Sequence, residues 1–169
     1  WRRIDDSMIP PRAKITGLYV NSALAKTEAV ENGFDEAILL TYNGHVSEGS
    51  GENIFLVQDG KLVTPPSSDN ILMGITRDTV MELAHDEMGI ETVERRIARS
   101  ELYTANECFL TGTAAHITPV IEIDHRKVRG GGVGMITKEL QRLYFDMVRG
   151  KNPKYIDWCL PAYRKLAKA

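Results

Sequence analysis

The sequence predicts a mixed α/β domain in which a mainly antiparallel sheet packs against helices. Three observations indicate this class: a helical pattern over 17–31, two hairpin signals soon after it, and an amphipathic helical pattern over 137–148. Strands joined by tight turns pair antiparallel, and the apolar face of a helix must be covered by another element. A chain of 169 residues is long enough to bury such a core.

The first part of the chain is expected to be irregular and then helical. Pro10 and Pro11 block a helix, so residues 1–13 should be irregular or briefly extended. The helix over 17–31 should end at Asn32-Gly33, because glycine accepts the left-handed conformation that commonly closes a helix.

Four short strands are expected next, paired as an antiparallel meander of two hairpins. Their ranges are 34–40, 45–47, 53–58 and 61–64. Asn43-Gly44 and Asp59-Gly60 separate the two partners of each hairpin. Both dipeptides suit two-residue turns, because these turns require positive φ at their central positions.

The second half is expected to alternate between helices and strands. A loop over 65–70 leads to a helix that begins with Thr76 as its N-cap and ends at Gly89. Further strands are expected at 90–97, 107–110 and 116–123, and further helices at 101–105 (capped by Ser100) and 137–148. The last helix has Leu140, Leu143, Tyr144 and Met147 on one face. Residues 129–134 are expected to be a flexible connection rather than a nucleotide-binding loop, since they do not match G-x-G-x-x-G after a buried strand.

Composition argues against several functions. The formal net charge of −2 gives no reason to expect nucleic acid or an anionic membrane. No apolar run approaches the roughly 20 residues of a membrane span, and no signal peptide opens the chain. Cys108 and Cys159 form no C-x-x-C pair, which favours a reducing cytoplasm over a disulfide scaffold or a metal site. Because the chain opens on Trp1 without an initiator Met, we expect that an N-terminal part is missing.

Two features are candidates for chemistry, and each has an ordinary alternative. The stretch from Glu48 to Phe55 brings two carboxylates to the start of an apolar strand, where unpaired charge is costly; a solvated hairpin corner is the ordinary interpretation. Lys14 precedes a helix and is either a solvated surface charge or a Schiff-base nucleophile. The glycine-containing helix entry at 72–78 could hold a phosphate, but any capped helix looks similar.

The spacing of these segments resembles the signature of class IV pyridoxal-phosphate aminotransferases. The matching positions are Glu48, Ser50, Asn53, Ile54, Phe55, Leu62, Thr64, Leu72, Gly74, Ile75 and Arg77. Within that class, E-G-S-G-E-N at 48–53, T-G-T-A-A at 111–115 and I-T-P-V at 117–120 are similar to the branched-chain amino acid aminotransferases. D-amino acid aminotransferases and aminodeoxychorismate lyases usually lack the second Glu and the T-G-T-A-A turn.

The resemblance implies a fold and a domain organisation. Residues 1–150 would be the large C-terminal, cofactor-binding domain of the D-amino acid aminotransferase-like fold, an antiparallel-rich pseudo-barrel sheet packed with helices. Residues 151–169, with Trp158 and Tyr163, would be a tail that docks or frays. The small N-terminal domain, which supplies an Arg to the cofactor phosphate, would be absent. The full-length protein would be a cytoplasmic homodimer or higher homo-oligomer.

The resemblance also implies pyridoxal 5′-phosphate as cofactor, with roles for particular residues. Lys14 would be the Schiff-base lysine, buried beside the ring, and would carry the substrate proton. Tyr19 would hydrogen-bond the ring hydroxyl. Glu48 would face the pyridine nitrogen and keep it protonated, which makes the ring an electron sink.

The remaining implied roles concern phosphate and substrate. The phosphate would bind the backbone N–H groups of Ile75 and Thr76 and the hydroxyls of Thr76 and Thr113. The substrate carboxylate would bind the backbone N–H groups of Thr113 and Ala114. Glu52 and Asn53 would not contact the cofactor directly but would hold the residues that do.

The implied activity is transfer of the amino group of L-leucine, L-isoleucine or L-valine to 2-oxoglutarate. A D-amino acid aminotransferase or an aminodeoxychorismate lyase of the same class is the alternative enzyme. A non-enzymatic alternative is a stable α/β body with a vestigial site, which would act as a structural or oligomerisation module.

Overall fold

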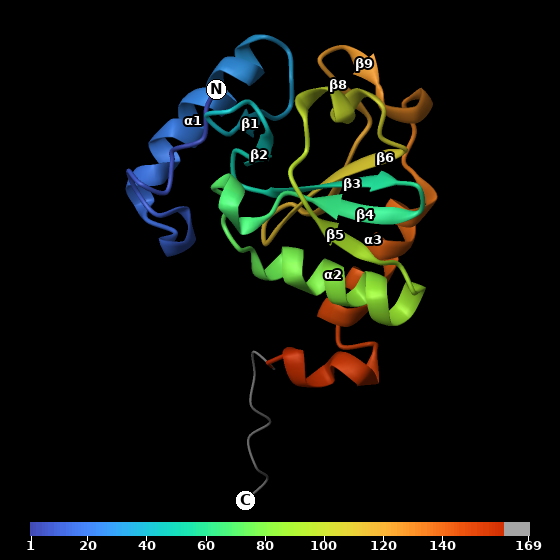
Figure 1. Cartoon of the computed structure of the whole chain (residues 1–169). Helices are drawn as coiled ribbons and strands as arrows, with labels where there is room; N and C mark the ends of the chain where they lie inside the picture. Colours follow the sequence, from blue (N-terminus) through green and yellow to red (C-terminus); the bar gives the residue numbers. More distant parts are fainter. Residues whose placement is uncertain (161–169) are drawn as a thin grey trace, which may run out of the picture.

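A five-stranded sheet lies at the centre of the structure, a computed structural model that describes residues 1–160 (Figure 1). The strand order is β5–β4–β3–β6–β7. The strands are β3 (Asn53–Gln58), β4 (Lys61–Thr64), β5 (Thr92–Glu94), β6 (Glu107–Gly112) and β7 (His116–Val120). β4 and β5 are parallel, and the other neighbouring pairs are antiparallel.

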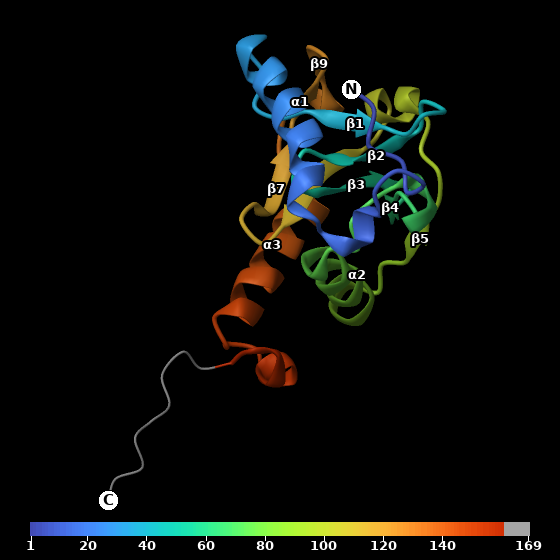
Figure 2. The same ribbon diagram turned by 90° about the vertical axis from the view of Figure 1, so that its left-hand side faces the viewer.

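Two small antiparallel sheets and three α-helices complete the described chain. The small sheets pair β1 (Ile38–Leu40) with β2 (Val46–Gly49) and β8 (Glu122–Ile123) with β9 (Arg126–Lys127). The α-helices are α1 (Tyr19–Glu31), α2 (Ile75–Met88) and α3 (Met135–Val148), and 3₁₀ turns span Pro11–Ala13, Thr16–Leu18, Ser67–Asp69, Arg99–Tyr103, Val128–Gly130 and Pro153–Trp158. Figures 1 and 2 show α2 and α3 side by side beneath the large sheet, with α1 beside β1 and β2.

The large sheet is covered on both faces. Phe55 and Val57 of β3 point into a core that includes Val80 and Leu83 of α2 and Leu140 of α3. The alternate residues of β3 point to the opposite face. Ile54 and Leu56 pack there with a second cluster that includes Val46, Ile97, Leu102 and Val128. Burial on both faces explains why the sequence from 54 to 57 is continuously apolar.

The mixed α/β, antiparallel-rich class is confirmed, and so are the main local signals. Asp59 and Gly60 both have positive φ in the expected two-residue turn, and Gly89 ends α2 in the left-handed conformation. In the first hairpin Gly44 has positive φ but Asn43 does not, and the connection between the paired residues Leu40 and Val46 is longer than a two-residue turn. β3 and β4 have the expected bounds. The expected apolar face of α3 is buried. The two hairpins do not form a single meander, however, because β1–β2 and β3–β4 belong to different sheets.

Three expected elements are shorter or of another kind. Strand 34–40 is reduced to β1, because its partner β2 ends at Gly49, opposite Ile38. The segment before β1 is instead bonded to α1, where the Lys26 ammonium contacts the Asp35 carbonyl and the Glu36 carboxylate. Strand 90–97 is reduced to the three residues of β5. Helix 101–105 is instead the 3₁₀ turn Arg99–Tyr103, with Ala98 rather than Ser100 at its N-cap.

Three boundaries in and around the family motif were also placed wrongly. Glu48 lies inside β2, so the corner itself is Ser50–Glu52. The N-cap of α2 is Gly74, and Thr76 lies within the first turn. β6 continues through Thr111 and Gly112 because Thr111 pairs with both Asn53 and Ile117.

The end of the described chain packs on the body. Tyr155 is buried in the α2–α3 core, and its hydroxyl donates to Glu87 of α2 at 2.8 Å. Tyr163 lies outside the described residues, and the division into 1–150 and 151–169 stays a prediction. Within residues 1–160, no helix combines the length and the apolar character that crossing a membrane requires.

Candidate active site

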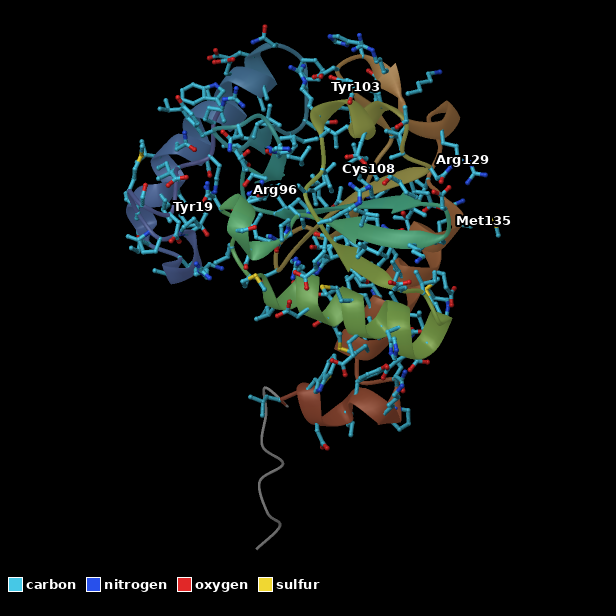
Figure 3. All side chains as sticks on the ribbon, in the orientation of Figure 1. Tyr19, Arg96, Tyr103, Cys108, Arg129 and Met135 are labelled. Carbon is cyan, nitrogen blue, oxygen red and sulfur yellow. The ribbon has the colours of Figure 1, made fainter. Side chains whose placement is uncertain are left out.

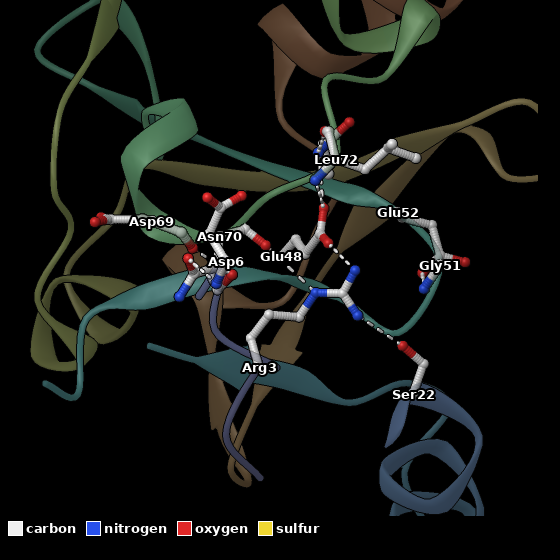
Figure 4. Close-up of polar contacts among 11 residues, drawn as sticks. Arg3, Asp6, Ser22, Glu48, Gly51, Glu52, Asp69, Asn70 and Leu72 are labelled. Carbon is white, nitrogen blue, oxygen red and sulfur yellow. Dashed lines mark hydrogen bonds and ion pairs between the residues drawn. The ribbon is translucent and has the colours of Figure 1, made fainter. Parts of the chain in front are cut away.

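Glu48 is a buried carboxylate with donors on both of its oxygens (Figure 4). Its Oε1 pairs with Arg3 Nη2 at 2.8 Å. Its Oε2 accepts hydrogen bonds from Asn53 Nδ2 and from the backbone N–H of Leu72, both at 3.0 Å. A buried carboxylate needs such partners, because losing its hydration without them is costly.

Burial raises the pKa of Glu48 to about 7, against the opposing effects of the Arg3 charge and the Leu72 N–H. The negative charge of Glu52 adds a smaller upward contribution. A carboxyl group in this condition responds strongly to an added positive charge, because an adjacent cation favours its ionised form. Glu48 is therefore suited to bind a cationic or proton-donating group.

A small cavity opens beside Glu48. It is lined by Arg3, Tyr19, Glu48, Ser50, Gly51, Glu52, Asn53 and Leu72, and its volume is about 20 Å³. A cavity of that size holds about one water molecule, so a larger ligand could present only one edge to Glu48. Tyr19, at the start of α1, reaches the same cavity from a distant part of the sequence.

The glycines of the motif let the Ser50–Glu52 corner close tightly. The Gly49 N–H donates to the Glu52 carbonyl at 2.7 Å, and the Gly51 N–H donates to Glu52 Oε2 at 3.0 Å. A Cβ on Gly49 would lie 2.9 Å from that oxygen, and a Cβ on Gly112 would lie 3.4 Å from the Gly51 carbonyl. The glycine spacing therefore closes the corner and brings the end of β6 against it.

Glu52 is only partly buried and takes no part in the pairing around Glu48. Burial is the main cause that raises the pKa of Glu52, and the neighbouring Glu36 carboxylate raises it further. Glu36 is itself paired with Lys26 at 2.7 Å. The second Glu of the motif thus belongs to a separate acidic group beside α1.

Asn53 joins the corner to the start of α2. Its Nδ2 donates to the Leu72 carbonyl at 2.7 Å as well as to Glu48. A Cβ on Gly74 would lie 2.3 Å from Asn53 Oδ1, so only glycine fits at this N-cap. The helix then begins with Ile75, which is exposed, and Thr76, which is buried. A helix start of this kind offers backbone N–H groups and a positive dipole end to an anion.

The other predicted site residues do not line the cavity. Lys14 is exposed rather than buried and has left-handed backbone angles (φ 51°, ψ 42°) between two 3₁₀ turns. Such a conformation costs a non-glycine residue on the order of 1 kcal/mol or more, and it occurs in tight turns as well as at functional sites. Thr113 and Ala114 lie exposed in the β6–β7 turn. The roles of Lys14, Thr113 and Ala114 stay predictions.

Arg3 is the residue that the sequence did not reveal. It contributes the charge opposite Glu48, yet it lies in the irregular first segment, without a motif around it. Its partners come from elements far along the chain, so no spacing rule could have identified it. Within residues 1–160, no group of three or more His, Cys, Asp or Glu side chains is placed to hold a metal ion.

Comparison with known families identifies the family of the chain. The family model described as amino-transferase class IV matches residues 1–123. The chain belongs to the class IV amino-transferase family. The earlier resemblance is thereby confirmed, and the T-G-T-A-A and E-G-S-G-E-N motifs lie within the matched region.

Individual relatives point to one branch of the family. The chain is 59% identical over 165 residues to a probable branched-chain-amino-acid aminotransferase of Aquifex aeolicus, covering 98% of this chain and 53% of the relative. The crystal structure of the branched-chain aminotransferase of Thermoproteus uzoniensis with norvaline is 51% identical, with a TM-score of 0.92, and the match covers 96% of this chain and 54% of that one.

A third relative has been solved with its cofactor. The crystal structure of the branched-chain amino acid aminotransferase of Thermobaculum terrenum, in its PLP-containing holo-form, is 44% identical, with a TM-score of 0.91. That match covers 94% of this chain and 52% of the other. The chain therefore spans about half the length of the relatives that it matches.

Proposed function

We propose that this chain carries the pyridoxal 5′-phosphate site of a branched-chain-amino-acid aminotransferase. The protein would transfer the amino group of L-leucine, L-isoleucine or L-valine to 2-oxoglutarate. The observation that carries the proposal is that Glu48 and Tyr19, from distant elements, line one cavity. Family membership and the names of the relatives support the reaction.

The residues present fit this cofactor. A buried carboxyl group whose pKa is about 7 fits a partner that brings a protonated nitrogen. The Tyr19 phenol, in the same cavity, fits a ring hydroxyl. The start of α2 at Ile75 and Thr76 fits a phosphate group, because its N–H groups and dipole attract anions. When bound, pyridoxal phosphate supplies an electron sink for the negative charge that develops at the substrate Cα.

Each residue then has a definite task. Glu48 holds the proton on the ring nitrogen, and Asn53 and the Leu72 N–H keep its carboxylate in place. Lys14 would hold the cofactor through its Nζ, and the same amine would be the base that takes the proton from the substrate Cα. In the β6–β7 turn, the N–H groups of Thr113 and Ala114 bind the substrate carboxylate, while the Thr113 hydroxyl joins the phosphate site.

Chemical labelling tests the attachment. Pyridoxal phosphate is added, the adduct is reduced with borohydride, and the labelled peptides are mapped. We expect the label on Lys14, and Lys14→Ala should abolish it. Lys26, which is paired with Glu36, and Lys61, which is paired with Glu91, serve as internal controls. A label on either control with none on Lys14 would overturn the assignment.

A substrate comparison tests the reaction. With 2-oxoglutarate as acceptor, the enzyme should use L-leucine far better than D-alanine. The opposite preference would indicate a D-amino acid aminotransferase.

We also propose a homo-oligomer in the cytoplasm. Support for the oligomer comes from α1, where Tyr19, Val20 and Leu24 expose apolar surface (Figure 3 labels Tyr19). An apolar patch of this kind usually marks an interface.

Support for the cytoplasm comes from the cysteines. Both are free thiols, and burial raises the pKa of Cys108 to about 12, which leaves it unreactive. Sedimentation of the native protein and cell fractionation test these two points.

A further inference from the structure

The Arg3 side chain is a buried guanidinium held by three different elements (Figure 4). Nη2 pairs with Glu48 Oε1 at 2.8 Å, and Nη1 donates to Ser22 Oγ of α1 at 3.1 Å. Nε donates to the Asn70 carbonyl at 3.4 Å, in the segment that leads to α2. A guanidinium has a planar, fixed set of donors, so these contacts leave it little freedom to turn.

The charged groups around Glu48 come from a few elements only. Arg3 approaches from the N-terminal segment and is the only basic side chain among the described residues that line the cavity. Glu52 approaches from the corner, and Tyr19 and Ser22 approach from α1. The remaining partners, Asn53 and the Leu72 N–H, are neutral. The Lys26 charge acts on Glu52, so Arg3 is the positive charge that acts directly on Glu48 and offsets the nearby Glu52 carboxylate.

The hydrogen bonds also show which acceptor site Glu48 has left. A carboxylate has about four lone-pair sites. Asn53 and Leu72 use two on Oε2, and Arg3 uses one on Oε1. The free site is therefore on Oε1, the same oxygen that Arg3 holds. A proton-donating ligand in the cavity would share this oxygen with Arg3.

We propose that Arg3 is a positioning residue that favours the ionised form of Glu48 against the effect of burial and aims the free acceptor site of Oε1 into the cavity, with Ser22 as its anchor. The consequence for cofactor binding rests on the proposed function, whereas the effect on Glu48 itself does not. Arg3 acts through Glu48 and need not contact the ligand.

Titration of Glu48 tests the proposal without any cofactor. In protein with ¹³C-labelled glutamate carboxyls, the Glu48 resonance is assigned with Glu48→Gln. Arg3→Gln should raise the Glu48 midpoint by about one pH unit or more. Arg3→Lys, which keeps the charge, should recover at least half of that shift. Arg2→Gln is the matched control, because Arg2 is exposed and its side chain, within residues 1–160, bonds only the Thr41 carbonyl. An unchanged midpoint in Arg3→Gln would overturn the proposal.

A second variant covers the case in which Arg3→Gln does not fold. Ser22→Ala keeps both charges but frees the guanidinium, so the Glu48 midpoint should rise by a few tenths of a pH unit. If Ser22→Ala titrates as the unmodified protein does, Ser22 does not anchor Arg3 toward Glu48, and the proposal fails.

Cofactor binding separates this proposal from the proposed function. In Arg3→Gln, the absorbance of bound pyridoxal phosphate should become pH-dependent over the range in which Glu48 titrates, while Arg2→Gln should behave as the unmodified protein. If the unmodified protein binds no pyridoxal phosphate, the proposed function fails. The cofactor-free titration of Glu48 still decides whether Arg3 positions it.

Discussion

Glu48 and Glu107 are equally buried, each with 4% of its surface exposed, but different kinds of partner hold them. Glu107, on β6, lies at the start of α3 and accepts the backbone N–H groups of Ile136 and Thr137 at 3.2 and 2.8 Å and the Thr137 hydroxyl at 2.7 Å. Glu48 instead lies beside a cavity and an arginine. A helix start satisfies a carboxylate with fixed backbone donors, whereas an ion pair beside a cavity leaves an oxygen that a ligand can reach.

The starts of α2 and α3 also differ in whether a carboxylate already occupies them. Glu107 closes the start of α3 so tightly that a Cβ on Gly134 would lie 1.8 Å from its Cδ. At α2, the N-cap Gly74 provides no side-chain cap, and Ile75 is exposed. The glycine run 129–134 leads to the closed start, where an anion would meet the Glu107 carboxylate. This contrast supports the phosphate site at α2 and argues against one at the glycine run.

The largest expected effect comes from removing the carboxylate that closes α3. Glu107→Ala should lower the free energy of unfolding by about 4 kcal/mol, because it leaves buried N–H groups at the helix start without acceptors. Urea unfolding measures the loss. Glu139→Ala, at an exposed pair with Arg142 on α3, is the control and should cost under about 1 kcal/mol. A loss under about 1 kcal/mol for Glu107→Ala would show that Glu107 is not important for stabilising the start of α3.

The functional side is tested by neutralising Glu48. Glu48→Gln keeps the shape but removes the charge opposite the ring nitrogen. The holoenzyme should lose about a hundredfold in transamination, corresponding to about 3 kcal/mol, while Lys14 still takes the borohydride label. Steady-state kinetics measures the loss of transamination, and peptide mapping measures the label on Lys14. Glu52→Gln should lose much less. Equal losses in both variants would mean that Glu48 has no special electronic role.

The pH dependence of stability offers a third test. Because burial raises the pKa of Glu48 from 4.5 to about 7, the folded state binds more protons than the unfolded state between these values. Stability from this group is therefore full below about pH 4.5 and is lost as the pH rises through about 7. The difference in unfolding free energy between the cofactor-free protein and Glu48→Gln should change by up to about 3 kcal/mol between about pH 4 and 8. A flat difference would show that Glu48 is not perturbed.

The smallest effect should come from the start of α2. Thr76→Ala should weaken binding of inorganic phosphate or pyridoxal phosphate by about fivefold, since one hydroxyl donor is worth about 1 kcal/mol. Thr79→Ala is the control, because the Thr79 hydroxyl donates to the Ile75 carbonyl on an exposed part of the helix. A crystal soaked in phosphate should show the anion at Ile75 and Thr76. An anion at 129–134 instead would show that the glycine run before α3, rather than the start of α2, is the phosphate site.

Local signals were sufficient for much of this fold. Asn43-Gly44, Asp59-Gly60 and Gly89 each mark a position where the backbone needs positive φ, and the structure has it there. The apolar run of β3 and the apolar face of α3 are likewise properties of a few consecutive turns or residues. The family resemblance rested on similarly local spacing, which is why it could be recognised from residues 48–77.

Only the tertiary structure decided how the charges are paired. The link from Arg3 to Glu48, the closure of α3 by Glu107 and the pairing of Lys26 with Glu36 each join segments that are distant in the chain or on different elements. The sequence determined the turns, the main apolar segments and the motif, because these depend on neighbouring residues. It could not determine which carboxylate would be neutralised and which would stay responsive, because that depends on partners and burial that exist only once the chain has folded.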